Sequence, residues 1–165
     1  PQPQAVLACF LSACQSHPHI LAATLFGSHA RGEADEWSDL DLGVVIADEA
    51  YDDLIAGREA FLRQLGEPLF IEDFGIDSVV FFVLADGTEG ELSYSRAGDF
   101  VEPYGPWRPL LDKTGILAEA KPRPQPDPAA AVEALRQQVM WFWHDLSHFI
   151  TAVGRGQLWW AYGQL

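Results

Sequence analysis

Two aspartates separated by one residue, Asp39 and Asp41, are the side chains best suited to chemistry in this 165-residue chain. They open a second predicted strand, and its run over residues 41–46 is typical of a buried strand. Side chains alternate across a strand, so both carboxylates are expected on one face, roughly 7 Å apart along the backbone. Both can then reach a pair of divalent ions held about 3.5–4 Å apart. Because burying two acids together without cations is costly, the pair predicts a metal site.

A glycine and a serine, Gly27 and Ser28, follow another apolar strand predicted over residues 20–26. Glycine lets a phosphate approach the backbone closely, and a serine hydroxyl with nearby N–H groups can bind its oxygens. Arg31 would neutralise phosphate charge, or is simply an exposed loop arginine. Gly-Ser after a strand is usually only a turn. The phosphate-binding interpretation therefore depends on the two aspartates, which follow the serine by eleven and thirteen residues.

Together these residues resemble the signature of the nucleotidyltransferase superfamily, which includes DNA polymerase beta-like, aminoglycoside-type and minimal nucleotidyltransferases. The sequence reads Phe-Gly-Ser-His-Ala-Arg-Gly over residues 26–32 and Ser-Asp-Leu-Asp-Leu over residues 38–42. The superfamily pattern is Gly-Ser, a short spacer, two acids one residue apart, and a third acid on a later strand. The resemblance implies an α/β (α+β) fold with a mixed sheet flanked by helices. His29 and Trp37 depart from the residues common among relatives, and both departures concern substrate contacts.

By this resemblance, Asp39 and Asp41 would hold two magnesium ions that bind the triphosphate of a nucleotide, with ATP favoured. Gly27, Ser28 and Arg31 would bind phosphate. An acceptor hydroxyl would attack the α-phosphate, so that a nucleoside monophosphate is transferred and pyrophosphate is released.

The third acid is expected on a neighbouring strand with its side chain on the face of the aspartates. Glu91 begins a strand predicted over residues 91–96, which a hairpin loop joins to a strand over residues 79–84. We favour Glu91 as the third metal ligand or as the general base for the acceptor, and a solvated hairpin acid is the alternative reading. Three other acids compete for this role. Glu89 is predicted in the hairpin loop, Asp77 at the far end of the strand over residues 79–84, and Asp99 beyond the strand over residues 91–96.

Three parts are predicted along the chain: a catalytic domain over residues 1–120, a proline-rich linker over residues 121–128, and a C-terminal helical segment over residues 129–165. Apolar spacing predicts helices over residues 4–16 and 49–65 of the first part. The last helix has no closing cap, so the segment is expected to belong to a larger helical domain or to be completed by a partner.

Aromatic side chains crowd the C-terminal segment and occupy too many helical angles for one core-facing stripe. An interface is therefore expected there, with a homodimer as one hypothesis. The segment is also similar to the helical domain that follows the catalytic domain in aminoglycoside-type nucleotidyltransferases. The aromatic residues are Trp141, Phe142, Trp143, Phe149, Trp159, Trp160 and Tyr162.

The net charge of −14 is uneven, because residues 1–120 carry 21 acids and 6 Lys or Arg, a balance of −15. A protein that binds nucleic acid normally has a basic stripe, so a nucleic-acid substrate is disfavoured. An acidic cleft would favour a cationic acceptor, although surface acids also serve solubility. The two cysteines, Cys9 and Cys14, indicate no disulfide framework, and no segment is expected to span a membrane. We expect a cytoplasmic protein.

These observations predict a magnesium-dependent nucleotidyltransferase that modifies a hydroxyl of a small, cationic, aminoglycoside-like molecule. Two alternatives stay open. One is a minimal-nucleotidyltransferase antitoxin that modifies or binds a partner protein, and the other is a catalytically silent nucleotide-binding relative.

Overall fold

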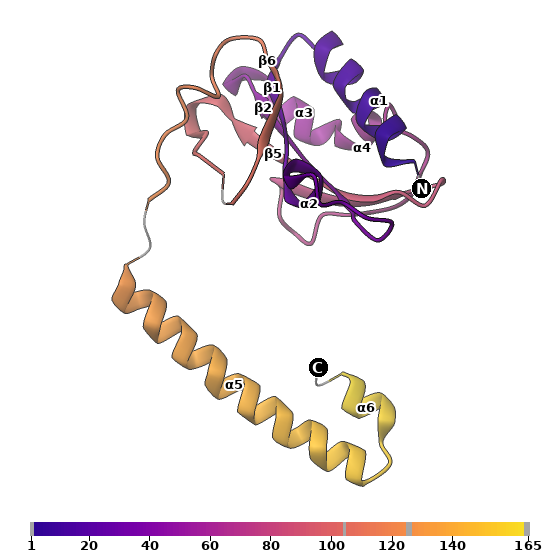
Figure 1. The fold of residues 1–165 in the computed structure, drawn as a ribbon, viewed down its shortest axis with the longest axis vertical. Coiled ribbons are helices and arrows are strands. Elements are labelled where there is room, and N and C mark those ends of the chain that lie inside the picture. The colour runs from indigo at the N-terminus through magenta and orange to yellow at the C-terminus, as the bar shows by residue number, and fades with distance from the viewer. Residues whose placement is uncertain (1, 104, 125–126, 164–165) are drawn as a thin grey trace. The chain divides into compact units, whose positions relative to one another are not determined.

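The computed structural model describes residues 2–103, 105–124 and 127–163. The chain divides into two compact units, Pro1–Arg123 and Pro124–Leu165, which are described separately (Figure 1).

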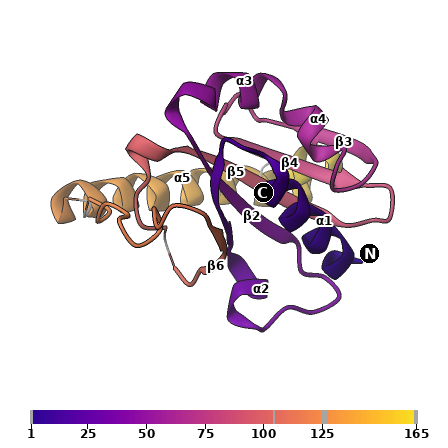
Figure 2. The same ribbon diagram turned by 90° about the horizontal axis from the view of Figure 1, so that it is seen from above.

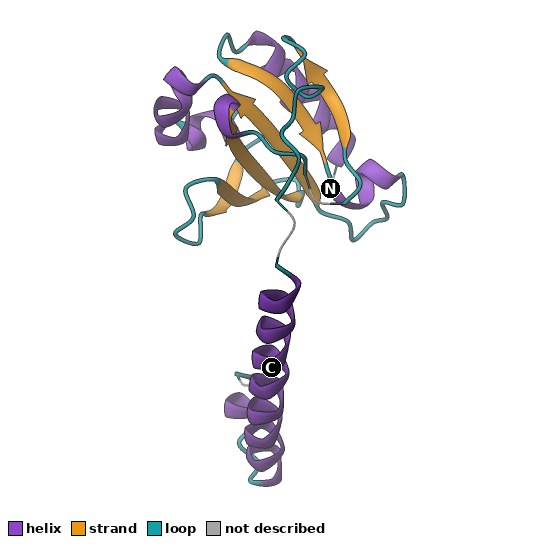
Figure 3. Ribbon diagram, turned by 90° about the vertical axis from the view of Figure 1, so that its left-hand side faces the viewer, coloured by secondary structure: helices purple, strands orange, loops and turns teal. Residues whose placement is uncertain are grey.

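The first unit is built on a six-stranded mixed sheet with strand order β3-β4-β5-β2-β1-β6, which confirms the predicted fold class (Figure 3). Strands β2 and β5 pair in parallel, and the other neighbouring strands pair antiparallel. The parallel pair lies at the centre of the sheet. The strands are β1 (Ile20–Leu25), β2 (Leu40–Ile46), β3 (Pro68–Glu72), β4 (Val79–Leu84), β5 (Glu89–Arg96) and β6 (Arg108–Asp112).

Helices cover one face of this sheet, and α3 and α4 follow one another along the same side (Figure 2). The first unit contains α1 (Pro3–Ser16), α2 (Gly27–Arg31), α3 (Tyr51–Ala56) and α4 (Arg58–Leu62), with 3-10 turns η1 (Asp48–Ala50) and η2 (Ala97–Asp99). Side chains from α1, α3 and α4 form the main core with the inward residues of β2, β4 and β5. Phe10 is fully buried there and packs edge-on against Phe61, with ring centroids 6.4 Å apart.

The opposite face of the sheet is covered over only part of its area. A second, smaller core of Ala22, Val45, Phe100 and Leu117 closes the end of this face that lies towards the carboxyl end of β2. Asp41 lies on the same face as Val45, four residues nearer the start of β2, and is only half-buried. The two cores therefore leave the start of β2 accessible on one face.

Several predicted boundaries are wrong. The single helix predicted over residues 49–65 is divided at Gly57, whose non-helical backbone separates α3 from α4. Strands β3 and β6 are not among the predicted strands, and each contains a proline, Pro68 or Pro109. Both are edge strands of the sheet, where a residue without an N–H group is tolerated.

The second unit consists of α5 (Pro128–Gly154) and α6 (Leu158–Tyr162). Asp127 caps α5, because its carboxylate accepts a hydrogen bond of 3.0 Å from the N–H of Ala129. Ala152 and Ala161 are buried, whereas most large apolar side chains of this unit are exposed. Within the described ranges, neither α5 nor any other helix combines the length and apolar character needed to cross a membrane.

Candidate active site

Two of the three predicted carboxylates are direct neighbours in the sheet. Asp41 of β2 is the register partner of Glu91 of β5 in the parallel ladder. Register partners point to the same face, and neighbouring strands lie about 4.8 Å apart. The structure thus brings together residues that are fifty positions apart in the sequence. Asp39 immediately precedes Leu40, the first residue of β2. It therefore lies just before the strand rather than within it, and its side chain is exposed.

The electrostatics of this group centre on Asp41. Its pKa is raised above the ordinary aspartate value, first by burial and then by the negative charges of Asp39 and Glu91. His29 and Arg31 act in the opposite direction and lower it. Three carboxylates and two basic side chains therefore lie close enough to influence one another, and the excess of negative charge suits a bound cation.

Gly27 is packed directly against the Asp41 carboxylate. Its φ of +61° is in the left-handed region, and a Cβ atom at this position would lie 2.0 Å from Asp41 Oδ2. The preceding residue, Phe26, donates its N–H to the backbone oxygen of Asp41 at 2.9 Å. The Gly-Ser segment is therefore fixed against β2 at the carboxylate, and a side chain at position 27 would displace that carboxylate.

Ser28 and Arg31 belong to the short helix α2 that begins at this glycine. The backbone oxygen of Ser28 accepts a hydrogen bond of 3.0 Å from the N–H of Glu33. Arg31 is exposed, and its Nε lies 2.6 Å from Glu33 Oε2 in an ion pair. An anion bound beside α2 would compete with Glu33 for this guanidinium.

The competing acids occupy different places. Strand β5 begins at Glu89, so the prediction that Glu89 lies in the hairpin loop and that Glu91 opens the strand is wrong. Glu89 shares the face of Glu91 and lines a cavity of about 390 Å³ together with Asp39 and Trp37. Asp77 lies in the turn before β4, and Asp99 lies in η2. Among these acids, Glu91 alone is the register partner of Asp41.

The donor atoms fit magnesium, which prefers carboxylate oxygens and usually binds through one or two of them together with waters and substrate phosphates. Among the residues that the structure describes, no three His, Cys, Asp or Glu side chains are grouped closely enough to hold a metal ion by themselves. Asp39, Asp41 and Glu91 therefore offer carboxylate oxygens of the kind that magnesium binds, without forming a closed ligand shell.

One residue of this site, His29, was not predicted as functional. Its Nε2 atom is buried and has no hydrogen-bond partner in the described part of the chain. The imidazole is also near enough to lower the pKa of Asp41. In the sequence, His29 is marked only by its departure from the residue common at this position among relatives, and that departure gives no indication of burial.

Comparison with protein-family models gives a match to the family described as the nucleotidyltransferase domain, over residues 9–109. The matched segment is more than half of the chain and contains all six predicted site residues. No curated protein matches the chain.

Proposed function

The chain belongs to the nucleotidyltransferase domain family, and from this premise we propose that it transfers a nucleoside monophosphate from a nucleoside triphosphate to a hydroxyl group. We propose ATP as the donor and a small cationic molecule, such as an aminoglycoside, as the acceptor. The net charge of −14 supports a cationic acceptor rather than a nucleic acid.

The observation that carries the proposal is the pairing of Asp41 with Glu91 next to the Gly27 turn. Two carboxylates side by side on an accessible sheet face, next to the Gly-Ser turn, suit the positioning and charge neutralisation on which phosphoryl transfer depends. A structural ion pair would instead place a basic partner on each acid.

Each residue has a part in this reaction. Gly27, Ser28 and Arg31 bind the triphosphate, and Asp39, Asp41 and Glu91 would hold magnesium. Bound magnesium would neutralise phosphate charge and lower the pKa of the acceptor hydroxyl. The hydroxyl oxygen forms a bond to the α-phosphorus, the bond from that phosphorus to the pyrophosphate oxygen breaks, and the hydroxyl proton passes to Glu91.

The proposed function is tested by measuring pyrophosphate release with magnesium, each of the four nucleoside triphosphates, and a panel of hydroxylated amines. We expect release that requires an acceptor. Nucleotide binding without pyrophosphate release, whichever acceptor is supplied, would favour the catalytically silent relative. Modification of a tightly bound partner protein alone would favour the antitoxin.

We expect Glu91→Gln to lower kcat by about 10²–10⁴-fold, which is the usual contribution of general acid–base catalysis. Steady-state kinetics with the best donor and acceptor measure the change. Asp99→Asn is the matched control and should keep the wild-type kcat, because Asp99 lies in η2 outside the site. The assignment fails if Glu89→Gln abolishes turnover while Glu91→Gln does not.

We also propose that the protein forms a homodimer through α5. Apolar side chains recur along this helix at alternating intervals of three and four residues, the pattern of a helix–helix seam. They are Val132, Leu135, Val139, Phe142, Leu146, Phe149 and Val153.

Light scattering of the wild-type protein should give twice the mass of one chain. The Phe142→Glu variant should give the mass of a single chain, and the control Gln137→Glu should remain a dimer. A monomeric wild-type chain would contradict the proposal.

A further inference from the structure

The sheet face that carries the carboxylates continues beyond them into an aromatic surface. The strand registers align Asp41 with Glu91, Glu91 with Phe81, and Phe81 with Glu72, in one row across β2, β5, β4 and β3. Side chains of register partners lie on the same face. At about 4.8 Å per strand, the Phe81 backbone lies about 5 Å from that of Glu91 and about 10 Å from that of Asp41.

Three phenylalanine rings gather on this surface, which we call the aromatic shelf: Phe70, Phe74 and Phe81. Phe81 is half-buried, and its ring centroid lies 6.2 Å from that of Phe70 and 6.5 Å from that of Phe74. The side chains of Phe70 and Phe74 are exposed by 50% and 63%. The core does not explain these rings, because the fully buried Phe82 points to the opposite face of β4.

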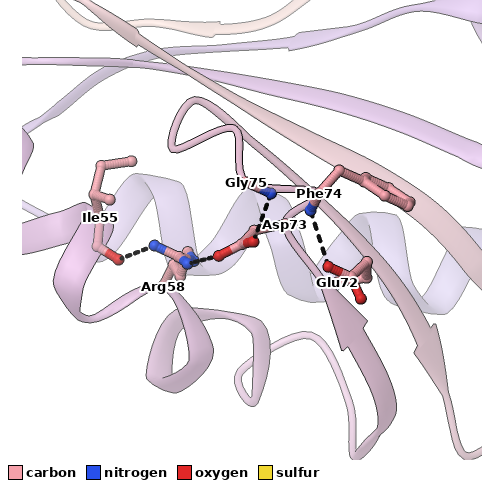
Figure 4. A network of polar contacts seen from close by, with 6 residues as sticks. All are labelled: Ile55, Arg58, Glu72, Asp73, Phe74 and Gly75. Carbon is pink, nitrogen blue, oxygen red and sulfur yellow. Dashed lines mark hydrogen bonds and ion pairs between the residues drawn. The ribbon is translucent and has the colours of Figure 1, made fainter.

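The position of Phe74 is maintained against a backbone preference. Its φ of 52° makes it the one non-glycine residue with positive φ in the described ranges, and a bulky residue in this region is an outlier. Glu72 Oε1 accepts the N–H of Phe74 at 3.0 Å, and Asp73 Oδ1 accepts the N–H of Gly75 at 3.0 Å (Figure 4).

Arg58 of α4 completes this network. It forms an ion pair with Asp73 and donates a hydrogen bond of 3.3 Å to the backbone oxygen of Ile55, so the turn is tied to the helical layer (Figure 4). An exposed ring in an unfavourable backbone conformation, fixed by several polar contacts, is typical of a binding surface.

Three acidic side chains border the shelf, in addition to Asp73, whose charge is paired with Arg58. Glu91 stands beside Phe81 in the row, Glu89 lies two residues away on the same face of β5, and Glu72 borders the shelf on β3. Aromatic faces attract cations, and acids at their edge strengthen that attraction. The shelf therefore complements a molecule that presents ammonium groups and a ring-sized apolar face.

We propose that the aromatic shelf binds the acceptor, a polycationic ring compound, and directs its hydroxyl towards Asp41 and Glu91. The inference rests on the proposed function and adds the place and the chemistry of the acceptor. The shelf is formed entirely by the Pro1–Arg123 unit.

The test uses titration calorimetry of the full chain with kanamycin, a polycationic probe, and with fully N-acetylated kanamycin, its neutral counterpart. We expect kanamycin to bind and its N-acetylated counterpart not to bind. Phe81→Leu and Phe74→Leu should each weaken the affinity for kanamycin by about 5–30-fold, since removing a cation–π interaction from a desolvated site has an effect of this size. ATP affinity should stay unchanged. Leucine retains the apolar volume, so both variants should fold, and thermal melting checks this.

Leu69→Ala is the matched control, because it removes an exposed apolar side chain from β3 that is not part of the shelf, and it should leave kanamycin binding unchanged. The proposal is overturned if the wild-type chain does not bind kanamycin, if the neutral counterpart binds equally, or if both phenylalanine variants bind like wild type. Where turnover is measurable, both phenylalanine variants should raise the KM for the acceptor and leave the KM for ATP unchanged. Loss of binding in the variants without any pyrophosphate release would instead uphold the shelf and refute the proposed reaction.

Discussion

Asp41→Asn should lower the rate of nucleotidyl transfer by about 10³-fold or more. Asp41 is central to the carboxylate group and the register partner of Glu91. A carboxylate that holds a catalytic cation contributes several kcal/mol to transition-state stabilisation, and each 1.36 kcal/mol corresponds to a factor of ten. Pyrophosphate release at saturating nucleotide and acceptor measures the effect.

Asp53→Asn is the matched control for this variant, because it removes the same charge from an exposed position on α3. It should transfer nucleotide at the wild-type rate. An Asp41→Asn variant that retains more than about a tenth of the wild-type rate would show that catalysis does not depend on this carboxylate.

The same substitution should not destabilise the fold. The pKa of Asp41 is raised by burial and by Asp39 and Glu91, so the folded chain retains this proton to a higher pH than the unfolded chain. Ionisation of Asp41 thus lowers the free energy of unfolding once the pH exceeds the pKa of this carboxyl in the unfolded chain, about 3.9. With a metal chelator present at pH 7, Asp41→Asn should have a higher melting temperature than wild type and than Asp53→Asn. This difference in melting temperature should vanish below about pH 3.9. A lower melting temperature at pH 7 would contradict this account.

Gly27→Ala should lower the transfer rate by about 100-fold or more while costing only about 1–2 kcal/mol of stability. The stability cost comes from placing alanine at a φ of +61°. The larger effect on rate arises because the new methyl group would collide with Asp41 Oδ2, which lies at the end of a side chain and can be displaced by rotation of that side chain. A displacement of about 1 Å in a catalytic group is enough for a 100-fold loss.

Gly115→Ala separates these two effects. Gly115 has a φ of +81°, and a Cβ atom there would meet no atom within 4 Å. Thermal melting should show a similar loss of stability in both variants, whereas kinetic assays should show a loss of rate only in Gly27→Ala. Equal rates in the two variants would mean that the contact between Gly27 and Asp41 has no catalytic consequence.

The local parts of the site could be predicted from the sequence because they depend on neighbouring residues. Strand alternation placed Leu40 and Asp41 on opposite faces, and the structure has Leu40 buried and Asp41 half-exposed. The turn at Gly27 and the strands β1, β2 and β4 follow from similarly short patterns. The family match over residues 9–109 agrees with this local signature.

The remaining features depend on long-range pairing or on tertiary contacts. The alignment of Asp41 with Glu91 depends on parallel pairing of β2 with β5, which no local pattern specifies. The positive φ of Phe74 could not be predicted, because glycine is the residue expected there and Gly75 is adjacent. The buried Nε2 of His29 likewise depends on what packs around α2.

The most direct test of the central claim is mass spectrometry of kanamycin after incubation with ATP, magnesium and the wild-type chain, with pyrophosphate measured in the same sample. The proposed function predicts a mass gain of one nucleoside monophosphate and one pyrophosphate for each modified molecule. With Asp41→Asn, the initial rate of both should be lower by about 10³-fold or more. Unmodified acceptors across the whole panel of hydroxylated amines, or release of orthophosphate in place of pyrophosphate, would contradict it.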